Sequence, residues 1–187
     1  MRHDQDVCAI AHWPFMRTGE GSERVVRVRC CGGVMVDLCC ASKVAVVHDQ
    51  QPELPEALVQ RNEVAVLFKR VADDPAAISR GWSELEEALG SLRGRKFYGA
   101  FDATIREYRV CVEIREGDLP DELGLELGRL PGGRYLQVRL RGEPPGVYDL
   151  IAPTFERLAK RVDPDPSRPS IEFYRRRDVI DLLLPVS

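Results

Sequence analysis

This chain has no long apolar run and only a small net charge, and each of these two features excludes a class of protein. Charged residues interrupt the apolar runs well before the roughly 20 residues that a membrane-spanning helix needs. The net charge of −3 and the isoelectric point near 5.7 lack the basic footprint of a nucleic-acid-binding domain. No stretch resembles a secretory signal peptide. We therefore expect a cytoplasmic protein that binds neither a membrane nor DNA.

Catalytic and metal-binding motifs are also missing. The six cysteines are expected to be reduced thiols, because disulfides persist mainly in secreted proteins. The vicinal cysteine pairs at residues 30–31 and 39–40 lack the CxxC spacing that is typical of zinc sites. No nucleophile triad is recognisable either. We accordingly expect no metal and no cofactor.

The first 44 residues are expected to form an N-terminal extension that precedes a domain at residues 45–187. Two β-rich runs within residues 25–40 are joined by Gly32-Gly33, which is a pattern typical of a tight hairpin. Alternatively, Met35 marks the true start of the protein. The sequence leaves both interpretations open.

The first half of the expected domain combines strands with one helix. Asp74 and Pro75 are typical of a helix start, and apolar residues follow at helical spacing up to Gly90. This helix has one apolar stripe, so it should cover one face of a sheet. Irregular connections are expected at residues 51–58 and 116–125. Strands are expected at residues 44–48, 63–71, 97–101, 108–114 and 125–130.

The second half repeats the order of the first. A strand at residues 134–141 precedes a helix marked by apolar residues from Tyr148 to Val162, in which Pro153 should cause a kink or delay the regular start. Two further strands are expected at residues 170–175 and 179–186.

Strand, helix, strand, strand therefore occurs twice, at about residues 63–114 and 132–186. Neither copy is large enough to bury its sheet face alone, so the copies should pair around a groove on a pseudo-twofold axis. The predicted fold is α+β, with two pseudo-symmetric repeats and antiparallel sheets around a central pocket. A sequence offset between the repeats makes Tyr98 the mate of Glu172, so the two side chains are expected to face each other near the axis.

Glu172 is the most informative residue, because it interrupts an apolar run that resembles a buried strand. A buried carboxylate is unfavourable by several kcal/mol unless it is paired, protonated or able to bind a cation. Alternatively, Glu172 lies on the solvent face of a half-exposed strand, because every second strand residue points outward.

Several short motifs carry a resemblance to a known family. They comprise residues 130–135 (Leu-Pro-Gly-Gly-Arg-Tyr), 140–142, 148–149, 171–174 (Ile-Glu-Phe-Tyr) and 182–186. Together with residues 97–102, they resemble the GyrI-like small-molecule-binding family, which includes the effector-binding domains of AraC-type and MerR-type multidrug regulators. The resemblance implies two strand-helix-strand-strand units around a concave pocket. No DNA-binding unit is visible in the first 60 residues, so the chain is more similar to the stand-alone members.

The resemblance also implies a ligand site. Glu172 matches the pocket-floor glutamate that attracts lipophilic cations in the regulators, and Tyr174 completes its Glu-x-Tyr motif. Tyr135 matches the aromatic residue of the Gly-Gly-x-Tyr strand. Ordinary core packing is the alternative role of the pocket aromatics. The remaining positions where such pockets carry aromatics are Trp82, Tyr98, Phe101 and Tyr148.

Three functions stay open at this point. The first is capture of hydrophobic small molecules, cationic ones among them, in drug sequestration or sensing. The second, implied by stand-alone family members, is hydrolysis of cyclopropane-containing cytotoxic natural products, with Glu172 as acid or base and Tyr98 or Tyr174 assisting. The third is haem binding or inhibition of a protein partner such as a topoisomerase, for which no residue in the matched region provides support. Basic residues such as Lys96 and Arg109 are also candidates for attracting an anionic ligand.

Overall fold

A computed structural model describes residues 55–187 of the chain. The expected extension, the hairpin at residues 25–40 and the strand at residues 44–48 lie outside the described residues. The described part forms the following elements: β1 (Glu56–Arg61), β2 (Val64–Ala72), α1 (Pro75–Leu89), β3 (Phe97–Asp102), β4 (Glu107–Glu113), α2 (Pro120–Leu123), β5 (Glu126–Leu130), β6 (Gly133–Arg141), α3 (Gly146–Asp149), α4 (Ile151–Ala159), β7 (Ser170–Arg176) and β8 (Val179–Pro185).

Helix α1 begins and ends as its sequence predicts. The Asp74 side chain accepts a hydrogen bond from the backbone N–H of Ala77 at 2.9 Å, and Pro75 is the first helical residue. The helix ends at Gly90, whose backbone N–H donates to Glu86 and Glu87 carbonyl oxygens. The second helical region is divided into α3 and α4, and Pro153 lies in the first turn of α4, where its missing N–H costs no helical hydrogen bond.

Two connections contain elements that the sequence did not predict. Strand β1 begins at Glu56, inside the connection expected at residues 51–58. The acidic connection at residues 116–125 contains the single-turn helix α2.

The described strands form one antiparallel sheet in the order β1-β6-β8-β7-β3-β4-β2-β5. The first repeat supplies β3-β4-β2 and the second supplies β7-β8-β6, so the two halves have matching order and meet where β3 pairs with β7. The predicted α+β fold with two strand-helix-strand-strand repeats is thus confirmed.

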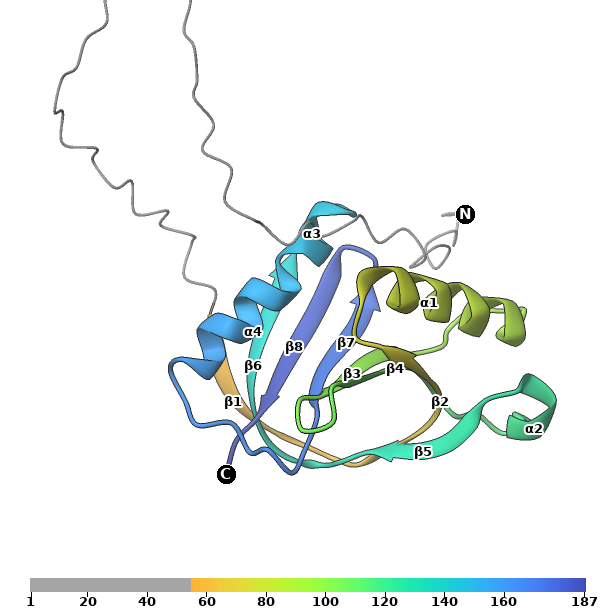
Figure 1. Cartoon of the computed structure of the whole chain (residues 1–187), viewed down its shortest axis with the longest axis horizontal. Coiled ribbons are helices and arrows are strands. Elements are labelled where there is room, and N and C mark those ends of the chain that lie inside the picture. The colour runs from red at the N-terminus through yellow and green to blue at the C-terminus, as the bar shows by residue number, and fades with distance from the viewer. Residues whose placement is uncertain (1–54) are drawn as a thin grey trace, which may run out of the picture. The chain divides into compact units, whose positions relative to one another are not determined.

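Two long strand segments link the halves a second time. β1 leads into β2 and β5 leads into β6, and the two segments pair as β1 with β6 and β2 with β5. Figure 1 shows these segments curving beneath the central strands β8, β7, β3 and β4, while α1 and α4 lie above them. The sheet therefore has a face that the helices cover and an opposite face toward which the long segments curve.

Each face has its own buried cluster. On the helix-covered face, residues such as Trp82, Leu85 and Leu158 from the helices pack on Val110, Leu182 and other strand residues. The opposite face, which we call the inner face, is lined by Val66, Phe68, Tyr98, Ala100, Cys111, Leu130, Tyr135, Ile171, Phe173 and Leu183. Because side chains alternate between the two faces of a strand, each strand residue points either to the helix-covered face or to the inner face.

Candidate functional site

Glu172 lies in the middle of β7 and is buried, with 6% of its surface exposed. Its neighbours Ile171 and Phe173 belong to the inner-face cluster, so Glu172 points to the helix-covered face. There, Oε2 of Glu172 accepts hydrogen bonds from the hydroxyls of Tyr108 at 2.7 Å and Tyr174 at 2.5 Å. The solvent-facing alternative for Glu172 is therefore wrong.

No basic side chain forms an ion pair with Glu172 among the described residues. Burial raises the pKa of Glu172 above its ordinary value, although the hydrogen bonds from Tyr174 and Tyr108 act in the opposite direction. Burial, with the adjacent carboxyl group of Glu172, also raises the pKa of Tyr108 and of Tyr174 well above the ordinary tyrosine value. Both phenols consequently remain hydroxyl donors at neutral pH.

Gly99 provides the space in which this cluster forms. It lies opposite Glu172 where β3 pairs with β7. A Cβ atom at this position would lie 2.0 Å from the Tyr108 hydroxyl oxygen and 2.7 Å from Oε2 of Glu172. Any larger residue at position 99 would therefore occupy the site of the hydrogen bond between Tyr108 and Glu172.

Aromatic rings from two helices contact the ring of Tyr174. Trp82 of α1 contacts the Tyr174 ring edge-to-face with centroids 5.2 Å apart, and Tyr148 of α3 contacts it at 6.5 Å. Trp82 also contacts Phe97 at 6.3 Å. Nε1 of Trp82 is buried and has no hydrogen-bond partner within residues 55–187. The helix-covered face thus contains the Glu172 carboxyl group, the hydroxyls of Tyr108 and Tyr174, and the indole N–H of Trp82.

The site residues expected from the sequence divide between the two faces. Trp82, Tyr148, Tyr174 and the half-buried Phe101 lie on the helix-covered face with Glu172. Tyr135 and Tyr98 belong to the inner-face cluster instead. Only some of the predicted residues therefore lie on the same face of the sheet as Glu172.

Tyr98 does not face Glu172, contrary to the pairing expected from the repeat. It pairs with Phe173, stacks on that ring at 4.9 Å, and donates its hydroxyl to Glu113 at 2.9 Å. Gly99, and not Tyr98, lies opposite Glu172, so the expected pairing is wrong by one residue. A one-residue shift in a strand places the side chain on the other face.

Tyr135 is fully buried, and its hydroxyl donates to the carbonyl oxygen of Pro131 at 2.7 Å. Arg168 lies over its ring at 5.0 Å. The hydroxyl thus helps to fix the turn between β5 and β6.

Tyr108 is the site residue that the sequence analysis missed. It begins the apolar alternation of Tyr108, Val110 and Val112 in β4, which indicates one shared face. That alternation, combined with the expected hairpin, could have placed Tyr108 on the face of Phe97. Its contact with Glu172 depends on the pairing of β3 with β7, which local patterns do not reveal.

Two strand-helix-strand-strand repeats in one antiparallel sheet place the described residues in the α+β class of folds. The family model for the GyrI-like small molecule binding domain matches residues 64–187. The chain therefore belongs to the GyrI-like family. The match begins at β2 and includes both repeats.

Solved structures share this fold at low sequence identity. An integron cassette protein from the mobile metagenome of Vibrio cholerae is 17% identical with a TM-score of 0.57, covering 71% of this chain and 95% of that one. SAV2435 bound to tetraphenylphosphonium is 13% identical with a TM-score of 0.53, covering 72% and 94%. The EcmrR C-terminal domain is 12% identical with a TM-score of 0.52, covering 72% and 98%. These similarities show the fold alone.

A comparison with curated proteins found no match. Residues 55–187 contain no cluster of three or more potential metal ligands, and the cysteine pairs lie outside that region. None of the helices in the described region has the length and apolar character needed to cross a membrane.

Proposed function

We propose that this protein captures hydrophobic, cationic small molecules at Glu172, in drug sequestration or sensing. The observation that carries the proposal is a buried carboxylate whose partners are two phenol hydroxyls rather than a basic side chain. Such a group keeps the capacity to pair with a cation supplied by a ligand.

The aromatic residues around the site favour the same ligand class. A cation near the Trp82, Tyr148 and Tyr174 rings would gain about 0.5–2 kcal/mol from each suitable ring face. Flat rings also accept ligands of differing shape, which favours a broad substrate range. A hydrogen-bond acceptor on the ligand would satisfy the unused N–H of Trp82.

The relative with a bound cation supports the choice of probe. The solved structure of SAV2435 has tetraphenylphosphonium bound, which is a hydrophobic cation. That finding concerns SAV2435 itself. We propose the same ligand class for this chain because its own carboxylate and rings have the required chemistry.

Tetraphenylphosphonium binding to the full chain tests the proposal. Calorimetric titration should show binding to the wild type and about tenfold weaker binding to Glu172→Gln, because the amide is neutral but similar in shape. Glu113→Gln is the matched control, because Glu113 bonds Tyr98 rather than a residue of the helix-covered cluster. Equal affinity for the wild type and Glu172→Gln would exclude Glu172 as the cation anchor.

Hydrolysis of a cyclopropane-containing compound is the second candidate function. It is supported by the raised pKa of Glu172, which favours a protonated acid able to donate to a ligand carbonyl, with Tyr174 within hydrogen-bond distance. Ring opening would break one ring C–C bond and form a C–O bond to water, while the electron pair passes to the protonated carbonyl. Water would return the proton to Glu172.

Product stoichiometry separates the two functions. Incubation with a cyclopropane-bearing alkylator should give no more than one equivalent of altered compound if the protein only captures its ligand. Product beyond one equivalent that is lost in Glu172→Gln would favour the hydrolase.

A further inference from the structure

Three aromatic rings of the inner face, those of Phe68, Tyr135 and Phe173, each lie beneath one or two guanidinium groups. Measured from Cζ to the ring centroid, these contacts are Arg70 and Arg109 over Phe68 at 5.5 and 5.4 Å, Arg168 over Tyr135 at 5.0 Å, and Arg175 and Arg61 over Phe173 at 5.0 and 5.8 Å. A guanidinium above a ring leaves its in-plane N–H groups available for hydrogen bonds.

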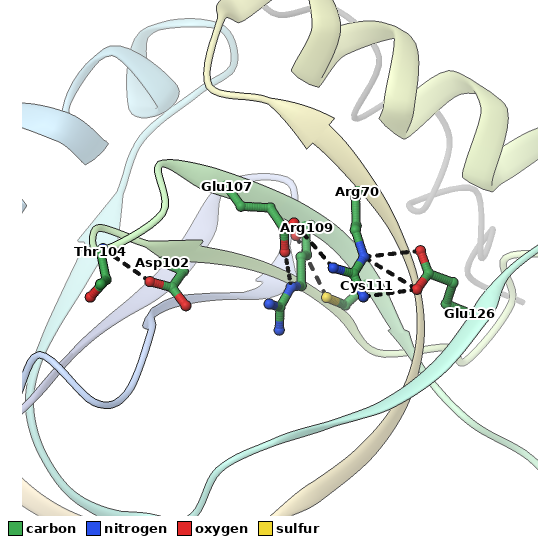
Figure 2. A network of polar contacts seen from close by, with 7 residues as sticks. All are labelled: Arg70, Asp102, Thr104, Glu107, Arg109, Cys111 and Glu126. Atoms are coloured by element: carbon green, nitrogen blue, oxygen red, sulfur yellow. Dashed lines mark hydrogen bonds and ion pairs between the residues drawn. The ribbon is translucent and has the colours of Figure 1, made fainter.

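Four of these five arginines form an ion pair with a carboxylate of the protein. The pairs are Arg70 with Glu126 at 3.0 Å, Arg109 with Glu107 at 2.6 Å, Arg168 with Asp165 at 2.8 Å and Arg175 with Asp181 at 2.5 Å. Figure 2 shows the first two, in which Arg70 joins Glu126 to Glu107 and Glu107 accepts from Arg109. Arg61 differs, because no carboxylate of residues 55–187 pairs with it.

Arg61 also lines a hollow of about 500 Å³, together with Asn62, Lys96 and Tyr98. The other charges around this hollow are already compensated. Lys96 pairs with Glu113 at 2.9 Å, and Glu63 pairs with Arg129. The guanidinium of Arg61 is therefore the one uncompensated charge among the residues that line the hollow.

We propose that this hollow is a second binding site, distinct from that at Glu172, and that it takes an organic monocarboxylate. A carboxylate matches the fork of guanidinium N–H groups and can form two parallel hydrogen bonds with it. One uncompensated positive charge matches a monoanion. A dianion such as phosphate would leave a negative charge near Glu63 and Glu113, which is unfavourable.

The two sites have opposite chemistry and lie on opposite faces of the sheet. Arg61 contacts the ring of Phe173, whereas Glu172, the preceding residue of β7, points to the helix-covered face. Binding of a carboxylate at Arg61 does not depend on the function proposed for Glu172. The hollow has room for an aromatic acid of two fused rings.

Calorimetric titration of the full chain with 2-naphthoate tests this site. The wild type should bind, and Arg61→Gln should bind about tenfold more weakly, because it loses a charge-assisted hydrogen-bond pair. Arg106→Gln is the matched control, since it removes an arginine that is paired with Asp73, and neither of these residues lines the hollow. Glu172→Gln should also bind 2-naphthoate as the wild type does, which separates this proposal from the one above.

Arg61→Lys and a thermal unfolding scan complete the experiment. The lysine variant keeps the charge but loses the fork, so its affinity should lie between those of the wild type and Arg61→Gln. Equal 2-naphthoate affinity in the wild type and in a folded Arg61→Gln would overturn the proposal. Displacement of 2-naphthoate by inorganic phosphate at equal concentration would overturn the monocarboxylate assignment.

Discussion

Glu172 combines burial with partners that donate hydrogen bonds but carry no charge. Burial raises its pKa, so the folded protein holds a proton that the unfolded chain releases near the ordinary glutamate pKa of about 4.3. The stability that this tighter proton binding at Glu172 provides is therefore fully present below that pH, and it is lost as the pH rises through the pKa of the folded state.

This linkage gives a prediction for Glu172→Gln. The variant does not titrate at this position, so its free energy of unfolding relative to the wild type should increase as pH rises above about 4.3, by at most about 1.4 kcal/mol per pH unit. Urea unfolding between pH 4 and 8 measures the difference. A difference that stays constant with pH would mean that the Glu172 pKa is not raised in the folded state.

Asp181 provides the opposite case in the same sheet. Burial alone would raise its pKa, but hydrogen bonds from Arg139 and Arg175 lower it below the ordinary aspartate value. Its stabilising contribution is present at neutral pH and is lost as pH falls through the folded pKa. Asp181→Asn should therefore approach the wild-type stability at low pH, whereas Glu172→Gln should gain relative to the wild type at high pH.

At Gly99 the absence of a side chain leaves room for the hydrogen bond between Tyr108 and Glu172. Gly99→Ala should lower the free energy of unfolding by about 1–3 kcal/mol, because the new methyl group overlaps the Tyr108 hydroxyl and Glu172. Chemical denaturation measures this loss. The control is Gly146→Ala, where no atom lies within 4 Å of the added Cβ, and it should change stability by less than about 1 kcal/mol. Similar losses in both variants would contradict the packing argument.

At the scale of single elements, the start of α1 depends on one side chain. Asp74→Ala should destabilise the protein by about 1 kcal/mol, because the backbone N–H of Ala77 loses its acceptor. Asp74→Ser should retain most of the stability, since serine is also a good N-cap residue. Thermal unfolding of the three proteins provides the measurement, and equal midpoints for Asp74→Ala and the wild type would show that the cap contributes nothing.

Elements with strong local patterns could be predicted from the sequence, and those that depend on distant partners could not. α1 has a proline, a capping aspartate and an apolar stripe, all of which are local signals. β1 has no fully buried residue and no clear alternation, and it forms a strand through its ladder with β6. That partner is far away in the sequence, so no local pattern indicates it.

The residues around Glu172 also divide into those that a local pattern predicts and those that depend on distant strand pairing. Glu172 and Tyr174 are two residues apart, so their shared face follows from strand alternation. The pairing of Glu172 with Gly99 depends on the exact offset between repeats, and the helices of the repeats differ in length. The expected partner, Tyr98, was one residue away and therefore on the wrong face.

At the scale of the whole molecule, the two repeats are joined both at the centre and at the periphery of the sheet. The central join is the pairing of β3 with β7, which places Glu172 opposite Gly99. The peripheral join is the ladder between the β1–β2 and β5–β6 segments, which borders the hollow at Arg61. The two proposed sites, at Glu172 and at Arg61, are thus each positioned by one of the two joins.

Gly132 tests the peripheral join. A Cβ at this position would lie 2.8 Å from the backbone N of Glu63 and 2.9 Å from the carbonyl oxygen of Arg61, and backbone atoms cannot move aside as a flexible side chain can. Gly132→Ala should therefore lower the free energy of unfolding by about 1–3 kcal/mol. Gly142→Ala, whose added Cβ meets only Val147 at 3.6 Å or more, is the control.

The two proposed sites should respond differently to Gly132→Ala. Displacement of Arg61 should weaken 2-naphthoate binding, whereas tetraphenylphosphonium binding should remain at the wild-type level, because Glu172 is positioned by the central join. Titrations of the folded variant with both probes measure this difference. If 2-naphthoate bound to Gly132→Ala as tightly as to the wild type while stability fell, the peripheral join would stabilise the fold without positioning Arg61.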